Sequence, residues 1–539
     1  MLLCYSTLYG QLNPQDSSIL PLIVINTLGN TIVDEPKITA HMGIIKNTQG
    51  SYNQLADNFN EYDGLIGIEE RGSSSSFFPK KGYGLETRDS LGENNNVELF
   101  GMPKENDWVL HGPYSDKSLI RNFLAYYYGE KMYNYSPRTQ FVELVIDNDY
   151  KGVYLFLEKI KRDDGRIDIS KLDDDDLLGD SVTGGYIVKI DKSTGSNNSS
   201  WTSSYQTNSS NPKDISFLYH YPKADEIKPA QKTYIQTFIS SFENALYGND
   251  FLDSSIGYKQ YIDINSFVDY YLLNEVTRNV DGYRISTFMY KNKDSKNNKL
   301  FIGPPCDYNL GWGNADYCDG GSSTGWASDF NLVCSGDNFQ IPFWWEKMLS
   351  DPEFLNRLNC RWDELRQGPL HSDSINEVVD SLSLMLQEPA IRNFTKWNVL
   401  NTWVWPNNFV GGSYISEIGY IKNWINDRLL WIDYNLPGSA LDCSFLSFSK
   451  KEAFSANLFP NPFLDKFFID FNQNTSNKKI NVLMYDLSGI LISSYSSLIN
   501  SSGTISSSEI LNKNDLNNGL YILIIRIGNQ EKHFKIIKQ

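Results

Sequence analysis

Apolar and polar residues alternate in different ways along the chain, and this pattern divides it into strands and helices. Alternating or short continuous apolar runs predict strands at residues 20–26, 38–46, 65–70, 83–87, 141–146 and 152–157. Apolar residues at helical spacing predict helices at residues 117–132, 230–247, 343–367, 374–387 and 415–434. The Ser- and Asn-rich segment 195–211 predicts a surface loop. The chain is therefore expected to be α+β, with a β-rich first part and a mainly helical second part.

The stretch from Asn265 to Asn314 is the most informative part of the sequence. Helical spacing over 267–276 predicts a helix that ends near 279–282, because Asn and Gly favour a turn there. Two strands then follow, at 285–290 and 300–302, around a polar turn. An antiparallel hairpin of this kind returns the chain to the end where it began.

Two acidic residues flank this hairpin, Asp281 before it and Asp307 after it, and we expect them to lie close together. Phosphoryl transfer to a hydroxyl group uses such a pair. Asp281 would orient the hydroxyl and accept its proton, while Asp307, helped by Asn309, would hold Mg²⁺ against the phosphate oxygens. Aspartates are also common in turns at strand ends without any catalytic role. Ser286 stands where protein kinases place a metal-binding Asn.

A possible phosphate-binding loop follows the strand predicted at 65–70. Arg71 is followed by a Gly and four Ser residues, whose backbone N–H groups and hydroxyls could cover phosphates. A plain surface loop has the same composition. We therefore take Arg71 and this turn as a candidate nucleotide contact that other residues must support.

Basic residues on neighbouring strands provide that support. Lys80 and Lys81 lead into the strand behind the loop, where kinase-like folds carry a lysine that binds nucleotide phosphates. We expect Lys81, or failing that Lys80, to bind the phosphates and to pair with Glu158. Lys189, in the strand-like run GGYIVKIDK, could also face the nucleotide. Solvated surface charges are the alternative for each of these residues.

A family resemblance adds to these observations. NVDGYRISTFMYK and the following GPPCDYNLGWGNADY resemble the spore coat protein H (CotH) kinase family, as do IEERGSSSSFFPKKGYGLETRD and VELVIDNDYKGVYLFLEKIKRDDGRIDISKL. The matches run from about Leu20 to Tyr434. The resemblance implies an atypical two-lobed kinase-like domain over 12–436, with Asp281 and Asp307 as its essential acids. It also implies ATP, Mg²⁺ or Mn²⁺, and a protein substrate with Ser or Thr acceptors. Cys306 departs from the family, which usually has Trp there.

The pattern of apolar and polar residues changes after a linker at 437–457. Short alternating strands with Asn and Gly turns predict a small antiparallel β-sandwich over 458–539. FPNPF, YDLSG, NGLYIL and KIIKQ together resemble the C-terminal sorting domain of the Bacteroidetes type IX (Por) secretion system. The resemblance implies the type IX secretion machinery as a partner, and export to the cell surface or the medium. The domain is usually removed, and we expect cleavage at 447–456. Without the resemblance, the pattern fits a generic Ig-like binding module.

The first residues, MLLCYSTLYGQ (1–11), are apolar and then small and polar, as at the end of a secretory signal peptide. They lack the basic start of such a peptide. They are either the remnant of a truncated leader or ordinary N-terminal residues. We favour the leader, because the C-terminal segment also indicates secretion.

Composition narrows the possible partners. A net charge of −17 and a pI near 4.8 argue against a nucleic-acid or anionic-membrane surface. No run approaches the roughly 18 apolar residues of a membrane span. Six cysteines without paired CxxC spacing do not predict a disulfide framework or a zinc site. Cys318 and Cys334 could pair across a Gly/Ser-rich loop, whereas Cys306, Cys360 and Cys443 are expected to be thiols.

Two other functions remain open from the sequence. The chain could be a non-catalytic surface protein on a kinase scaffold that has lost its activity, which Ser286 favours. It could also be a carbohydrate-active enzyme that uses Asp281 and Asp307 as paired carboxylates around a sugar cleft.

Overall fold

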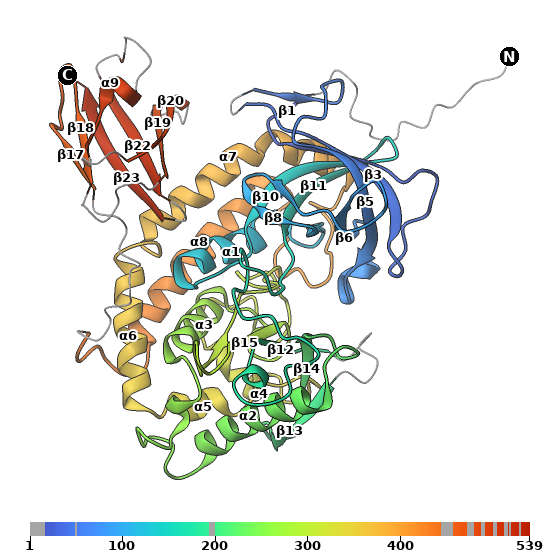
Figure 1. The fold of residues 1–539 in the computed structure, drawn as a ribbon, viewed down its shortest axis with the longest axis vertical. Helices are drawn as coiled ribbons and strands as arrows, with labels where there is room; N and C mark the ends of the chain where they lie inside the picture. Colours follow the sequence, from blue (N-terminus) through green and yellow to red (C-terminus); the bar gives the residue numbers. More distant parts are fainter. Residues whose placement is uncertain are drawn as a thin grey trace. The chain divides into compact units, whose positions relative to one another are not determined.

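A computed structural model gives the structure of the protein (Figure 1). It describes residues 17–48, 51–192, 200–443, 456–471, 479–486, 491–499, 504–510, 516, 519–527 and 530–538. The chain separates into two compact units, the first formed by Met1–Lys46 and Tyr52–Cys443, the second mainly by Ser444–Gln539. The expected leader remnant at 1–11 lies outside the described residues, as do 444–455, which form most of the expected linker.

The first part of the larger unit is a closed seven-stranded barrel. Its strands, in spatial order, are β10 (Thr139–Ile146), β11 (Asp149–Glu158), β9 (Asp107–His111), β6 (Gly82–Arg88), β5 (Tyr62–Arg71), β3 (Ile38–Ile45) and β2 (Leu22–Asn26). A parallel pairing of β10 with β2 closes it. Alternate side chains point inward and form a core that includes Ile23, Met42, Ile66, Trp108 and Phe156. The predicted β-rich first part is confirmed. Its closure into a barrel was not predicted from the sequence.

A second sheet lies later in the same unit. Its order is β13 (Ser200–Gln206), β14 (Asp214–Tyr221), β12 (Tyr186–Ile190), β15 (Thr287–Lys291) and β16 (Leu300–Ile302), and every pairing is antiparallel. The prediction of a loop throughout 195–211 is wrong, because β13 occupies part of it. As an edge strand, β13 has one exposed face and one half-buried face, and its Trp201 stacks on Phe217. Such a strand tolerates many polar residues.

Helices make up most of the rest of this unit. They are α1 (Arg121–Met132), α2 (Pro229–Tyr247), α3 (Ile264–Thr277), α4 (Phe330–Val333), α5 (Trp344–Met348), α6 (Pro352–Arg366), α7 (Ser372–Lys396) and α8 (Tyr414–Asn435). From Ser266 onward every residue of α3 is buried, so α3 is the central helix of the unit. The helix predicted at 343–367 is two helices, because Pro352 cannot continue α5 and Asp351 caps the start of α6.

Short elements connect these parts. They are the strands Ser17–Ser18 (β1), Asn53–Gln54 (β4), Val97–Leu99 (β7) and Met102–Glu105 (β8), and the 3₁₀ turns Ser74–Phe77, Ser181–Thr183, Tyr258–Gln260 and Ala327–Asp329. No helix in the described part of the chain is long and apolar enough to cross a membrane.

The smaller unit consists of two antiparallel sheets. One has the order β17 (Ala456–Phe459), β18 (Phe468–Phe471), β21 (Thr504–Ser506), and the other β20 (Leu491–Leu498), β19 (Lys479–Asp486), β22 (Gly519–Ile527), β23 (Gln530–Lys538). A short helix, α9 (Ser507–Ile510), follows β21. Side chains from both sheets, among them Ile469, Val482 and Leu523, share one core.

Two disulfides stabilise the larger unit. Cys318 pairs with Cys334, one of the pairings the sequence left open. The prediction that Cys360 and Cys443 are thiols is wrong, because they form the second bond. After α8 the chain returns to α6, where the Asn356 side chain accepts from Leu441 N at 2.6 Å and brings Cys443 beside Cys360. Cys306 is a free thiol.

Candidate functional site

The end of α3 places Asp281. Asp263 caps the start of the helix by accepting a hydrogen bond from Ser266 N at 2.8 Å, and Arg278 ends it in a left-handed conformation (φ 45°). The chain then turns, and Asn279 Oδ1 accepts from the backbone N–H of Asp281 at 3.2 Å. Asp281 therefore occupies a turn that is fixed by the helix terminus.

The β15–β16 hairpin brings Asp307 to the same place. Met289 pairs with Ile302, and the strands return the chain towards the end of α3, as predicted. The side-chain amide of Asn279 donates to the carbonyl oxygen of Asp307 at 3.2 Å. One asparagine side chain therefore contacts the backbone of both acids.

Helix α1 supports the Asp307 segment from the other side. The backbone N–H of Asp307 donates to the hydroxyl of Tyr126 at 3.3 Å, and that of Tyr308 donates to Asn122 Oδ1 at 2.6 Å. Asn122 also hydrogen-bonds His111 Nε2, on barrel strand β9, at 3.1 Å. Asp307 itself has a left-handed backbone (φ 58°), which is unusual outside glycine and clusters at functional sites.

The two carboxylates interact electrostatically. Burial and, after it, the negative charge of Asp281 raise the pKa of Asp307 to about 6, although the positive charges of Arg71 and Lys192 oppose the shift. Burial also raises the pKa of Asp281, and Arg284 opposes that shift. Asp307 is nevertheless exposed at the surface when the whole residue is considered, so a ligand can reach it. This arrangement would favour a cation, which would relieve the repulsion between the two acids.

Arg71 brings a positive charge to the acids from the barrel. It is the last residue of β5, it is exposed, and it lowers the pKa of Asp307. Its guanidinium forms no ion pair within the part of the chain that the structure describes. A guanidinium in this position could bind a phosphate group next to a cation held by Asp307.

The two predicted phosphate lysines have structural partners. Lys81 lies 3.6 Å from Glu70 Oε2 and donates to Ser76 O at 2.5 Å, so it ties the Ser-rich turn to β5. Lys80 is buried, which lowers its pKa well below the usual range. Its ammonium group donates to Val153 O at 2.6 Å, Asn393 Oδ1 at 2.7 Å and Pro113 O at 3.4 Å. A phosphate would have to compete with these acceptors for Lys80.

The predicted ion pair between Glu158 and Lys80 or Lys81 is not formed. Glu158 is buried and accepts a hydrogen bond from Arg138 Nη1 at 2.8 Å. The strand register explains this. Arg138 directly precedes the first residue of β10 and lies opposite Glu158, the last residue of β11. Glu158 pairs with Trp108 on β9, whereas Lys81 lies against Gly112, four residues further along. Four strand residues separate the two backbone positions by roughly 13 Å along β9.

Lys189 is linked to the two acids through Asp191, a residue that the sequence analysis missed. Its ammonium group forms an ion pair with Asp191 at 2.7 Å, and the charge of Asp191 acts on both Asp281 and Asp307. Ile190 pairs with Thr287, which places Asp191 beside Ser286 at the end of the ladder. The signal for Asp191 was an acidic residue near the end of the strand predicted over GGYIVKIDK (184–192), where only Lys189 was singled out.

Arg284 was missed as well. Its guanidinium lies 2.9 Å from Asp281 Oδ1, and its position three residues after the acid was the only signal in the sequence. Asn309, the expected helper for the metal, is half-buried two residues after Asp307. Among the described residues, no group of three or more His, Cys, Asp and Glu side chains is arranged to hold a metal ion. A Mg²⁺ or Mn²⁺ ion here would be held by Asp307, a neighbouring oxygen ligand and the phosphates of the nucleotide, a donor set that suits Mg²⁺.

Two sequence models of protein families match the chain. A sequence model of the CotH kinase protein family matches residues 68–432, and a model of the secretion system C-terminal sorting domain matches residues 457–539. A search of the curated proteins gave no match.

Among solved structures, dimeric latent PorU from Porphyromonas gingivalis is 24% identical over 16% of this chain and 9% of its own, with a TM-score of 0.12. So small a likeness carries no argument about the fold. The sorting-domain match indicates export through the type IX secretion system, to the cell surface or into the medium. Because the CotH match covers more than half of the chain and contains both acids of the site, the protein belongs to the CotH kinase family.

Proposed function

We propose that the protein is a secreted kinase that transfers the γ-phosphoryl group of ATP to a Ser or Thr hydroxyl of a protein, with Mg²⁺ or Mn²⁺. The observation that carries this proposal is the juxtaposition of Asp281 and Asp307, whose backbones share the side chain of Asn279. The exposed guanidinium of Arg71 acts on Asp307 from the barrel, which suits a phosphate between them. The CotH kinase family match supports the same reaction.

Each residue then has a role. Arg284 occupies Oδ1 of Asp281, so the remaining oxygen is left to orient the acceptor hydroxyl and take its proton. Asp307, with Asn309, would hold the cation. The cation, when bound, neutralises charge on the phosphate oxygens. Arg71 would bind those oxygens from the barrel side, and Lys81 and Lys189 are further candidates for this contact.

The architecture can be described in the same terms. We take the seven-stranded barrel as the N-terminal lobe of an atypical kinase, and the helices with the second sheet as its C-terminal lobe. The two sheets of the smaller unit, which share one core, would be the sorting β-sandwich. The type IX machinery would recognise this domain and remove it during export.

A non-catalytic surface protein is the second candidate. The observation that favours it is Ser286, a residue too short to replace a metal-binding Asn at this position. Asp191 lies beside Ser286 and offers a carboxylate in its place, so we favour the kinase.

Two measurements separate these functions. The first is thermal unfolding with ATP, with and without Mn²⁺. A bound ligand stabilises the fold according to its concentration over its Kd, so the wild type should gain stability only with both present. Asp307→Ala should lose this gain, and Asp281→Ala should keep it.

The second measurement is transfer of labelled phosphate from ATP to protein. Asp281→Ala should reduce this transfer to background, because no carboxylate accepts the proton. Asp380→Ala is the control, since Asp380 forms an exposed ion pair with Lys422. Undiminished transfer by Asp281→Ala would overturn the catalytic assignment. A wild type without ATP stabilisation and without transfer would establish the non-catalytic alternative.

A further inference from the structure

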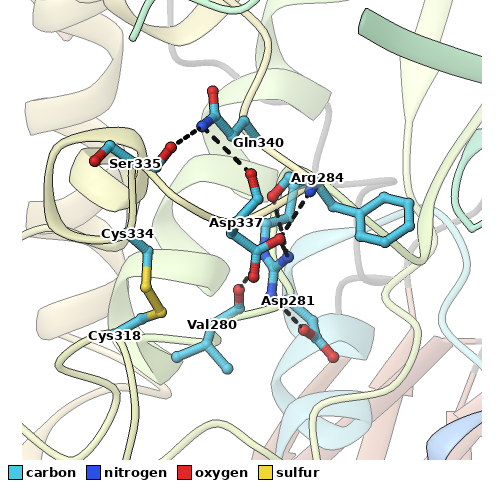
Figure 2. The surroundings of a disulfide bond; sticks show 9 residues. Val280, Asp281, Arg284, Cys318, Cys334, Ser335, Asp337 and Gln340 are labelled. Atoms are coloured by element: carbon cyan, nitrogen blue, oxygen red, sulfur yellow. Dashed lines mark hydrogen bonds and ion pairs between the residues drawn. A yellow bond between two sulfur atoms is a disulfide. The ribbon is translucent and has the colours of Figure 1, made fainter. Parts of the chain in front are cut away.

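Arg284 connects Asp281 to a second acidic residue, Asp337 (Figure 2). Its Nη2 lies 2.9 Å from Asp281 Oδ1, and its Nη1 lies 3.2 Å from Asp337 Oδ1. The remaining hydrogen bonds of the guanidinium go to backbone carbonyls, from Nε to Val280 at 2.6 Å and from Nη1 to Phe339 at 3.1 Å. The side chain is only 4% exposed. Arg284 is therefore held in one orientation, and it fixes one oxygen of Asp281.

The Cys318–Cys334 disulfide lies directly beside this arrangement (Figure 2). The backbone N–H of Asp337 donates to the carbonyl oxygen of Cys334 at 3.0 Å, so the position of Asp337 depends on that cysteine. The segment closed by the bond also contains Phe330, whose ring centre lies 4.1 Å from the Arg284 guanidinium. The disulfide therefore holds two groups that contact Arg284, one charged and one aromatic.

The same closed segment packs against the turn that carries Asp281. Gly320 lies so close to Val280 that a Cβ added there would be 2.5 Å from Val280 Cγ1. Arg284 also holds Val280 in place, because its Nε donates a hydrogen bond to the carbonyl oxygen of Val280. The residue before Asp281 is therefore held both by Arg284 and by the disulfide-closed segment.

We propose that Arg284 and Asp337 are positioning residues for the Asp281 carboxylate, and that the Cys318–Cys334 bond keeps them in place. Phosphoryl transfer would then require the oxidised protein. This inference rests on the proposed function, because it assigns Asp281 as the base. We call Arg284, Asp337 and the Cys318–Cys334 bond the relay. The reduced chain would still bind ATP, since the groups assigned to ATP and the cation lie outside this relay.

Formation of the bond requires a donor disulfide, such as oxidised glutathione or the disulfide of an oxidoreductase. One cysteine thiolate attacks the donor and releases one donor thiolate, which leaves a mixed disulfide. The second cysteine thiolate displaces the remaining donor thiolate. The two cysteine protons end on the two donor thiols, so the protein is oxidised by two electrons and the donor is reduced by two. Because the cytoplasm keeps thiols reduced, the active form would arise only after export.

The second disulfide provides a matched control. We would compare Cys318→Ser/Cys334→Ser with Cys360→Ser/Cys443→Ser, and measure phosphate transfer over a range of ATP concentrations. The first variant should lose at least about tenfold in kcat and keep KM for ATP within about twofold, because only base orientation is disturbed. The second should keep both constants within about twofold. Equal behaviour of the two variants would overturn the role of the disulfide.

Substitutions within the relay test the positioning residues themselves. Arg284→Gln should lower kcat at least about tenfold with KM for ATP unchanged, and Arg284→Lys should recover part of the loss because it restores the charge. Asp337→Asn should lower kcat in the same way, by a smaller factor. Wild-type kcat in Arg284→Gln, or a KM that rises as much as kcat falls, would refute the positioning role.

Amide hydrogen exchange separates this inference from the proposed function. Breaking the Cys318–Cys334 bond should speed exchange in residues 280–286 and 335–340, and breaking the Cys360–Cys443 bond should not. If the wild type transfers no phosphate but the two cysteine variants show this difference in exchange, the proposed function fails, and the positioning of Arg284 and Asp337 by the disulfide stands as a structural finding. If exchange in these segments is the same in both variants, the relay is refuted whatever the activity.

Discussion

The side-chain amide of Asn279 lies 3.2 Å from the carbonyl oxygen of Asp307, on the far side of the β15–β16 hairpin. Asn279 also accepts a hydrogen bond from the backbone of Asp281. Because Asn279 is 3% exposed, both bonds form away from bulk water. The spacing of the two acids is therefore set by a residue that takes no part in the chemistry.

Replacing this residue should damage the site more than the fold. Asn279→Ala removes both hydrogen bonds and should lower the free energy of unfolding by about 1–3 kcal/mol. It should also weaken Mn²⁺-dependent ATP binding, which titration calorimetry would measure. Asn359→Ala is the control, since Asn359 donates to two backbone carbonyls at α6 and after α8. Equal ATP affinity in the two variants would contradict the role of Asn279.

Metal binding should depend on pH through Asp307. The pKa of Asp307 is raised to about 6, so the carboxylate is mostly ionised at pH 7 and mostly protonated at pH 5. A metal ligand must be deprotonated, so the affinity for Mn²⁺ should fall about tenfold between pH 7 and pH 5. Electron paramagnetic resonance of free Mn²⁺ would measure this. An affinity that stays constant across this range would rule out Asp307 as a ligand.

The ion pair of Glu275 and Arg428 should be essential for the fold. Both side chains are fully buried, and their closest atoms are 3.2 Å apart. Glu275→Ala would leave the charge of Arg428 buried without its partner, at a cost of about 3–5 kcal/mol in the free energy of unfolding. Asp380→Ala breaks an exposed ion pair and should cost less than about 1 kcal/mol. Denaturant unfolding of both variants would show whether burial accounts for this difference.

The C-terminal domain should be separable from the larger unit. A chain that ends after Cys443 keeps the bond to Cys360, so we expect it to remain soluble and to bind ATP and Mn²⁺ like the full chain. Ending the chain at Leu436 would remove Cys443 and should lower the free energy of unfolding by about 2–4 kcal/mol. Thermal unfolding of the two truncated chains tests this difference.

Export provides a separate test of the sorting domain. In a host with a type IX system, the chain that ends after Cys443 should stay inside the cell, and the full chain should be exported. Mass spectrometry of the exported protein should find residues 535–539 missing, because we expect the domain to be removed. Their retention would contradict this removal. Export of the truncated chain would show that the domain does not direct sorting.

Sequence alone determined the local elements of this protein. The helix and the hairpin around Asp281 and Asp307 were predictable, because apolar spacing, capping residues and turn residues act over a few positions of the chain. The approach of the two acids followed from the hairpin, since antiparallel strands must return to their start. The family resemblance rested on this stretch and on further contiguous motifs between Leu20 and Tyr434.

Only the tertiary structure decided which distant groups meet. Lys80 and Glu158 both lie in the barrel region, but they do not pair. The strand register places Arg138 opposite Glu158, where the two form an ion pair, and Lys80 is buried against Asn393 of α7. The bond between Cys360 and Cys443 depends on how the chain returns to α6 after α8. Such contacts are set by which surfaces are buried together, and a pattern that extends over a few residues carries no information about that.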